Sequence, residues 1–276
     1  MTLLYRFPPE NIVTFRARFT TLKPWLPALL AACLIAPAQA HFGMIIPATD
    51  VVLETSNSPL RLTLSFSHPM EGQGMDMARP LAFGVRDGDR TVDLLDRLKP
   101  TKVMGHAAWT ADYPFKRPGV GVFFMQPAPY FEPAEDKFIE HLTKVIVPAY
   151  GEESGWDLPL GLAAEIVPLT RPFGNYTGNL FSAQVRVAGQ PAPGVDVEVE
   201  HYNARGAYAA PNPYLVTQAV RTDANGVFHY AVPFAGWWGF AALTTAPSTL
   251  KHQGVDKPME RGAVLWTRFV DPKRQR

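Results

Sequence analysis

An alternation of apolar and polar residues begins after residue 40 and predicts β-strands in the first half of the chain. In the stretch "LRLTLSFSH" at residues 60–68, apolar side chains occupy every second position from Leu60 to Phe66. A period of two residues indicates a strand with one buried face. The same parity places His68 on the apolar face, just before Pro69 ends the strand. Further strands rich in β-branched and aromatic residues are predicted at residues 109–115, 119–127 and 137–147.

The second half of the chain, residues 162–270, is also predicted to be β-structure, but its turns are different. Val195, Val197 and Val199 share one face of a strand that follows a Gly-Gln-Pro-Ala-Pro-Gly turn, and "AGWWGFAAL" predicts an aromatic strand. The "TDANG" motif is interpreted as a turn, because it lacks the later ligands and the terminal Glu of a calcium loop. These motifs resemble the small exported β-sandwiches of the transthyretin or carboxypeptidase-regulatory type.

Together, these patterns predict an all-β protein with two β-sandwich domains. The first is expected at residues 41–150 and carries the candidate metal site. A linker at 151–161 leads to the second, Ig-like or transthyretin-like domain at 162–270, followed by a tail at 271–276. The chain has 27 prolines and 21 glycines among 276 residues, so long helices are not expected.

The first forty residues are predicted to be a secretory signal peptide. Four basic residues precede the apolar run "PWLPALLAACLIAPA", and a small-x-small cleavage sequence ends at Ala40. The run contains prolines and is too short to span a bilayer. Cleavage after Ala40 would make His41 the first residue of a periplasmic protein. As an alternative, "LAAC" resembles the lipobox of bacterial lipoproteins, which would leave Cys33 lipidated at the new terminus.

The composition after residue 40 argues against some classes of binding partner and ligand. The predicted mature part has 22 basic and 24 acidic residues, which argues against nucleic acid. Cys33 is the only cysteine, so neither a disulfide nor a thiolate metal ligand is expected after cleavage.

A group of metal donors follows the first predicted strand. The motif "SHPMEGQGMDM" combines His68 with Met70, Met75 and Met77. Thioethers suit Cu(I), whereas imidazole suits nickel, copper and zinc alike. The alternative interpretation is that each methionine packs the loop against the end of a sandwich.

His41 is the most informative candidate ligand, because its free amine and its imidazole would lie on one residue after cleavage. Both can bind one metal in the arrangement called a histidine brace. A third nitrogen would complete the tetragonal set that Cu(II) and Ni(II) favour. His68 is the first candidate for this third nitrogen ligand and His106 is the second. His141 is interpreted as a core histidine. No catalytic residues can be singled out from spacing, so we expect a binding protein rather than an enzyme.

Two further groups of residues have open interpretations. Glu132, Glu135 and Asp136 could attract cations or form an ordinary solvated loop. The aromatic residues could form a docking face for a membrane partner, or they could close the interface between the two sandwiches; they are Tyr130, Phe131, Trp237, Trp238 and Phe240.

Long motifs throughout residues 41–268 resemble a family of bacterial periplasmic proteins linked to nickel and cobalt uptake. They include "HFGM", "HPMEG", "PYFEPAEDKF", "EIVPLTRPFG" and "AGWWGFAAL". Proteins of that family accompany energy-coupling-factor type metal transporters. The resemblance implies a β-rich exported protein that binds a divalent transition metal, Ni(II) or Co(II), and passes it to a membrane permease. The matching residues that it implies as ligands are His41, His68 and His106.

Three hypotheses follow from the sequence. The first is a metal-binding accessory of nickel or cobalt uptake. The second is a periplasmic copper-binding protein that uses the brace and methionine ligands. The third is a structural pair of β-sandwiches without metal.

Overall fold

The computed structural model describes residues 41–54, 56 and 58–274. The predicted signal peptide and Cys33 lie outside these residues. Regular structure in the described part consists of twenty-one strands and two short 3₁₀-helices, η1 (Leu95–Arg97) and η2 (Pro213–Leu215). The all-β prediction is therefore confirmed. No helix in this part of the chain has the length and apolar character needed to cross a membrane.

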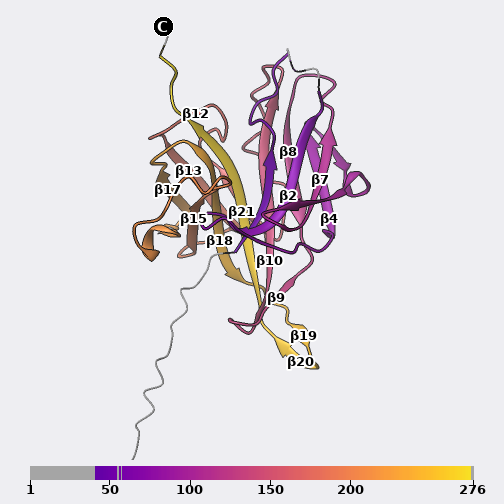
Figure 1. Ribbon diagram of the computed structural model, residues 1–276, viewed down its shortest axis with the longest axis vertical. Helices are drawn as coiled ribbons and strands as arrows, with labels where there is room; N and C mark the ends of the chain where they lie inside the picture. Colours follow the sequence, from indigo (N-terminus) through magenta and orange to yellow (C-terminus); the bar gives the residue numbers. More distant parts are fainter. Residues whose placement is uncertain (1–40, 55, 57, 275–276) are drawn as a thin grey trace, which may run out of the picture. The chain divides into compact units, whose positions relative to one another are not determined.

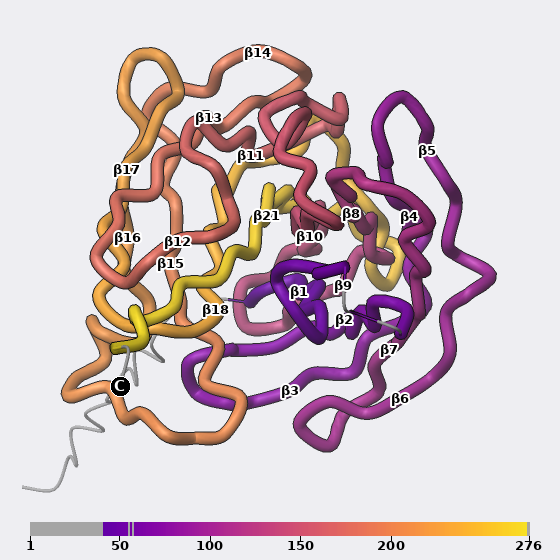
Figure 2. The backbone as a smooth tube through the Cα atoms, turned by 90° about the horizontal axis from the view of Figure 1, so that it is seen from above, coloured from indigo at the N-terminus to yellow at the C-terminus, as the bar shows by residue number. Residues whose placement is uncertain are grey.

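A ten-stranded central sheet connects the two halves of the chain (Figures 1 and 2). Its main path is β16 (Gln218–Arg221), β15 (Asp196–His201), β18 (Gly236–Thr245), β21 (Met259–Val270), β10 (Lys137–Ala149), β8 (Gly119–Gln126), β4 (Ala82–Asp87) and β5 (Arg90–Asp93). Two short strands extend it: β9 (Tyr130–Glu132) pairs with β10, and β12 (Asn175–Tyr176) pairs with β21.

Two smaller sheets flank the central sheet. The first flanking sheet contains β1 (Phe42–Pro47), β2 (Leu60–His68), β7 (His106–Tyr113), β6 (Lys99–Val103) and β3 (Gln73–Met75). The second flanking sheet contains β11 (Ala164–Pro168), β13 (Leu180–Val187), β14 (Gln190–Pro191) and β17 (Val227–Ala231). A separate hairpin is formed by β19 (Leu250–His252) and β20 (Val255–Lys257).

The central sheet is buried on both faces, because successive residues of its inner strands enter different hydrophobic cores. In β21, Val264 and Trp266 belong to the core shared with the first flanking sheet, whereas Ala263 and Leu265 belong to the core shared with the second. A strand covered on both sides is apolar at successive positions instead of alternating. The two β-sandwiches thus share their middle layer.

Strands β10 and β21 lie in parallel at the centre of this layer, with Phe138 opposite Met259 and Val145 opposite Trp266. Antiparallel strands make the other long pairings in the central sheet. Strands from before and after residues 151–161, the predicted linker, therefore hydrogen-bond within one sheet. The sequence pattern did not anticipate this shared sheet, because pairing between distant strands leaves no local signal.

Several local predictions agree with the structure. Strand β2 begins at Leu60 and ends at His68, and its alternate residues from Leu60 to His68 are buried. The predicted strand at 137–147 forms most of β10. The "TDANG" segment is a turn between β16 and β17, in which the Asp223 carboxylate accepts hydrogen bonds from the backbone N–H groups of Asn225 and Val227.

Candidate metal centre

The pairing of β1 with β2 brings His41 and His68 together. Phe42 lies opposite Ser67 in this antiparallel pair, so the preceding residue, His41, lies next to His68. The centres of the two imidazole rings are 4.4 Å apart. Both side chains are buried, with relative exposures of 8% for His41 and 6% for His68. The two histidines that the sequence singled out first are therefore neighbours at one end of the first flanking sheet.

Glu132 adds a carboxylate to this pair. Its Oε2 atom lies 3.1 Å from Nε2 of His41, and both side chains are nearly covered. Tyr130 precedes Glu132 by two residues in β9, and its ring centre lies 6.2 Å from that of His41. The sequence identified Glu132 only as part of an acidic group, and the pairing of β9 with β10 gives it a position beside His41.

Burial keeps the His41 imidazole neutral. Its pKa is lowered to about 4, mainly because burial disfavours the charged ring and secondarily because His68 lies beside it, while the charge of Glu132 opposes this shift. A neutral imidazole has a free lone pair for a metal, so protons compete little with a metal at this ring near neutral pH.

His141 and Glu260 lie behind the first pair, on the central sheet. His141 is 1% exposed, and its Nε2 atom lies 3.6 Å from Oε1 of Glu260 without forming a hydrogen bond. The backbone N–H of Gly43 donates a 3.4 Å hydrogen bond to Nδ1 of His141, which leaves Nε2 as the nitrogen that faces Glu260. The sequence predicts His141 as a core histidine, and Glu260 is not among the predicted site residues.

Gly262 provides the space for the His141 ring. A Cβ atom at Gly262 would overlap the ring, whereas one at Gly43 would overlap Oγ1 of Thr143. Gly262 is opposite His141 in the parallel pairing of β10 with β21. The backbone of β21 can approach the imidazole because residue 262 has no side chain.

Lys137 and several carboxylates determine the charge of this region. The Lys137 Nζ atom lies 2.6 Å from Oε2 of Glu260 and 2.5 Å from Oε2 of Glu135. Burial alone would raise the pKa of Glu260. Its neighbours His141 and Lys137 outweigh this effect and lower the pKa to about 2. Burial, together with the charges of Glu260 and Glu135, raises the pKa of Glu198 to about 7. A group of carboxylates around the imidazoles attracts cations.

The predicted methionine ligands are used in packing. Met77 is buried in the core below the first flanking sheet, and Met75 packs against the same core. Met70 is also buried. Its backbone N–H donates a hydrogen bond to Glu200, and its carbonyl accepts one from Asn203. These two hydrogen bonds attach the loop after β2 to the second half of the chain. These contacts are packing and backbone contacts, and the ligand role of the methionines stays a prediction.

His106 begins β7 in the first flanking sheet. Gly74 of β3 pairs with Ser67 of β2, and a Cβ atom at Gly74 would meet Met104, Val103 and the His106 ring. The His106 Nδ1 atom lies 3.4 Å from Oδ1 of Asp76, and its side chain is 46% exposed. Within residues 41–274, excluding 55 and 57, no group of three or more His, Cys, Asp or Glu side chains is arranged to hold a metal ion.

The aromatic residues do not form one surface. Trp238 and Phe240 are buried in the core of the second sandwich, and Trp237 packs against the first core. Phe131 stacks on His252, with ring centres 3.7 Å apart. Tyr130 lies beside His41.

One protein family matches most of this chain in sequence. Residues 38–246 match the model of a domain of unknown function, DUF4198, which covers most of the chain. The chain therefore belongs to the DUF4198 family. None of the curated proteins matches it significantly in sequence.

The solved structures that this chain matches have low sequence identity and low TM-scores. The D0-D1 domain of intimin is 11% identical, with 84% of this chain and 100% of that chain covered and a TM-score of 0.23. A chimeric titin Z1Z2 functionalized with a peptide from decorin is 11% identical, with 86% and 98% covered and a TM-score of 0.21.

Proposed function

We propose that this protein is a periplasmic transition-metal-binding protein that captures Ni(II) or Co(II) for a membrane permease of an energy-coupling-factor type transporter. The observation that carries the proposal is the contact between His41 and His68, two buried imidazoles 4.4 Å apart. Two buried imidazoles side by side are well suited to share a metal ion.

The start of the mature chain supplies the further nitrogen donor of the proposed site, and β9 supplies a carboxylate beside His41. Cleavage after Ala40 would give His41 a free amine, so one residue would supply two nitrogens and His68 a third. A planar or tetragonal nitrogen set suits Ni(II) and Cu(II). Chelation by the amine and the imidazole of one histidine uses Nδ1, so Glu132, 3.1 Å from Nε2 of His41, would orient the imidazole from the opposite edge of the ring.

Copper on the same nitrogen atoms is the second candidate. The brace geometry serves Cu(II) as well as Ni(II), so the pairing of His41 with His68 supports both. A thioether site for Cu(I) has less support, because Met70 and Met77 are buried in packing. Capture of nickel or cobalt for a permease rests in addition on the sequence motifs that resemble uptake proteins, and export rests on the first forty residues.

Metal titration of the processed chain tests the proposal. The chain beginning at His41 is titrated with Ni(II), Co(II), Cu(II), Cu(I) and Zn(II), and the complexes are characterised by absorption spectroscopy. His41→Ala and His68→Ala should each weaken binding about ten- to hundred-fold or more, on the order of other losses at metal sites. His229→Ala is the matched control, because this exposed histidine bonds Ser182 in the second flanking sheet. Absence of binding tighter than about 10 μM for every metal would reject metal binding.

A further inference from the structure

A pocket of about 310 Å³ in the second half of the chain is lined by His201, the last residue of β15. Part of its wall is the segment after this strand, which contains η2, and another part is β18 with the residues that precede it. Among the described residues that line the pocket there is no Asp, Glu, Lys or Arg, and His41, His68 and Glu132 do not line it. Its volume is at the lower end of the range for small-molecule sites.

Three aromatic side chains of the pocket wall surround the His201 imidazole. The ring centres of Tyr208, Phe234 and Trp238 lie 5.1, 4.9 and 5.3 Å from that of the imidazole. Tyr208 and Phe234 also stack on each other, with ring centres 4.8 Å apart. The indole N–H of Trp238 donates a 2.9 Å hydrogen bond to the carbonyl of Phe234. Aromatic faces and edges of this kind bind another planar ring by stacking or edge-to-face contact.

The imidazole of His201 adds a hydrogen-bond acceptor to these rings. His201 is 5% exposed, and within the part of the chain that the structure describes its Nδ1 atom has no hydrogen-bond partner. The backbone carbonyl of Ala235 accepts a hydrogen bond from the ring, and Nε2 is the nitrogen that lies against the next residue, Gly236. This arrangement assigns the ring proton to Nε2 and leaves Nδ1 as an acceptor. Burial lowers the pKa of His201, so the ring is neutral at neutral pH.

The backbone around the pocket is adapted to hold this imidazole and the Tyr208 wall. Gly236 has a φ of 141°, which favours glycine, and a Cβ atom there would overlap Nε2 of His201. The side chain of buried Asn203 donates a hydrogen bond to the carbonyl of Tyr208 and accepts one from its N–H. The aromatic wall and the acceptor are therefore in place without a ligand, as in most small-molecule sites.

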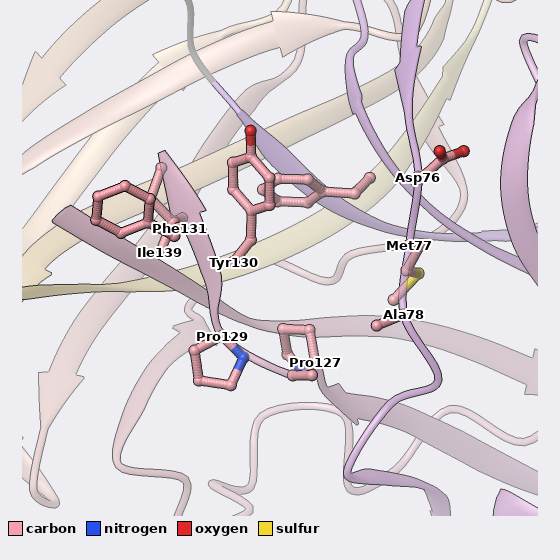
Figure 3. A pocket seen from close by; sticks show the side chains of 10 residues that line it. Asp76, Met77, Ala78, Pro127, Pro129, Tyr130, Phe131 and Ile139 are labelled. Atoms are coloured by element: carbon pink, nitrogen blue, oxygen red, sulfur yellow. The ribbon is translucent and has the colours of Figure 1, made fainter. Parts of the chain in front are cut away.

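A second apolar pocket, beside Tyr130 and Met77, lacks such an acceptor (Figure 3). Its volume is about 190 Å³. Its polar side chains have partners: Asp76 accepts a hydrogen bond from the N–H of Ala107, and the Tyr130 hydroxyl is hydrogen-bonded to Glu132. Buried acceptors in proteins normally have a donor, so the unpartnered Nδ1 distinguishes the pocket at His201 as a ligand site.

We propose that the pocket at His201 binds an uncharged aromatic molecule that carries an N–H or O–H group, such as an indole or a phenol. The ligand ring packs against Tyr208, Phe234 and Trp238, and its donor hydrogen-bonds to Nδ1 of His201. A charged ligand is disfavoured, because the described lining residues offer no opposite charge and an unpaired buried charge is costly. This inference goes beyond the proposed metal-binding function and does not depend on it.

A comparison of indole with benzofuran tests this inference. The two molecules have nearly the same size and shape, but indole has an N–H donor where benzofuran has a ring oxygen. Isothermal titration calorimetry measures the affinity of the processed chain for each molecule. Indole should bind with a Kd below about 1 mM and roughly three- to ten-fold more tightly than benzofuran, since one net hydrogen bond contributes about this factor.

Two variants locate the binding site. His201→Phe keeps an aromatic ring of similar size and removes the acceptor, so indole and benzofuran should bind it with equal affinity. Ala210→Phe enlarges a lining residue, leaves the imidazole unchanged and should weaken the binding of both molecules at least ~10-fold. Ala224→Phe, in the exposed turn between β16 and β17, is the matched control and should bind both as the unchanged protein does. Circular dichroism confirms that each variant is folded.

Three results would overturn the inference. The first is the failure of indole to bind with a Kd below about 1 mM. The second is equal affinity of the unchanged protein for indole and benzofuran, which would show that the imidazole does not accept a hydrogen bond from the ligand. The third is an indole preference that persists in folded His201→Phe, or an indole affinity that persists in folded Ala210→Phe, because binding would then occur elsewhere.

Discussion

His41 lies beside His68 at the open end of the β1–β2 pair, with its ring 4.4 Å from that of its neighbour and its Nε2 atom 3.1 Å from Glu132. One antiparallel register creates this contact, because Phe42 opposite Ser67 fixes which residues come next on each strand. The predicted cleavage site precedes His41 directly. Processing of the chain and assembly of the proposed site are thus linked through one residue.

The chain that keeps one extra residue before His41 should bind metal weakly. Ala40 converts the amine of His41 into a peptide nitrogen, which is a much poorer donor, while every side chain stays the same. We expect a loss of about ten- to hundred-fold or more, on the order of other losses at metal sites. The measurement compares the chain beginning at His41, the chain beginning at Ala40 and His41→Ala. Equal affinity of the first two would show that the amine is not a ligand.

Metal affinity should fall as the pH decreases from 8 to 5. The α-amine has a reference pKa of about 7.7 to 8.0, so protons compete with the metal for it throughout this range. The pKa of the His41 imidazole is lowered to about 4 by burial, so this ring stays neutral and contributes little to the decrease. Titrations at several pH values should show a steep profile for the processed chain and a shallower one for the chain beginning at Ala40. A flat profile for the processed chain would indicate carboxylate or thioether ligands.

Without metal, acid should destabilise the protein through His41. The pKa of this histidine is about 4 when folded and 6.5 in its unperturbed state, so between these values the unfolded chain binds more protons. The stability contributed by burying the neutral ring is complete above pH 6.5 and is lost as the pH falls toward 4. Urea unfolding with a chelating agent present should show a smaller acid loss in His41→Gln than in the unchanged protein. His229→Gln, at an exposed position, should retain the full loss.

Gly262→Ala should destabilise the fold through His141. The added Cβ atom would overlap the imidazole, and the strands on both sides are buried, so the ring has little space to move. Overpacking of this kind costs roughly 1 to 3 kcal/mol. Thermal or urea unfolding measures the change. The same substitution in a His141→Ala background should cost clearly less, because the overlapping ring is gone. Equal costs in the two backgrounds would contradict the proposed clash.

Local pattern was enough to predict β2, most of β10 and the side that His68 faces. The alternation from Leu60 to Phe66 defines the buried face of β2, and a period of two then requires His68 to lie on that face. This face depends on backbone geometry over a few residues, so the sequence determines it without knowledge of the fold. The small-x-small sequence before His41 is equally local, and the cleavage there stays a prediction.

The rest of the site was decided by contacts between segments that are distant in the chain. Glu260 meets His141 only because β10 and β21 pair in parallel across more than a hundred residues, and Gly262 is needed only because that pairing brings a backbone against a ring. The methionines after His68 resemble ligands in the sequence. In the fold, Met77 packs in the hydrophobic core, and the backbone of Met70 is hydrogen-bonded to Glu200 in the second half of the chain. A donor that is close in sequence can still be directed elsewhere, because burial of apolar surface and strand register are settled by the whole fold.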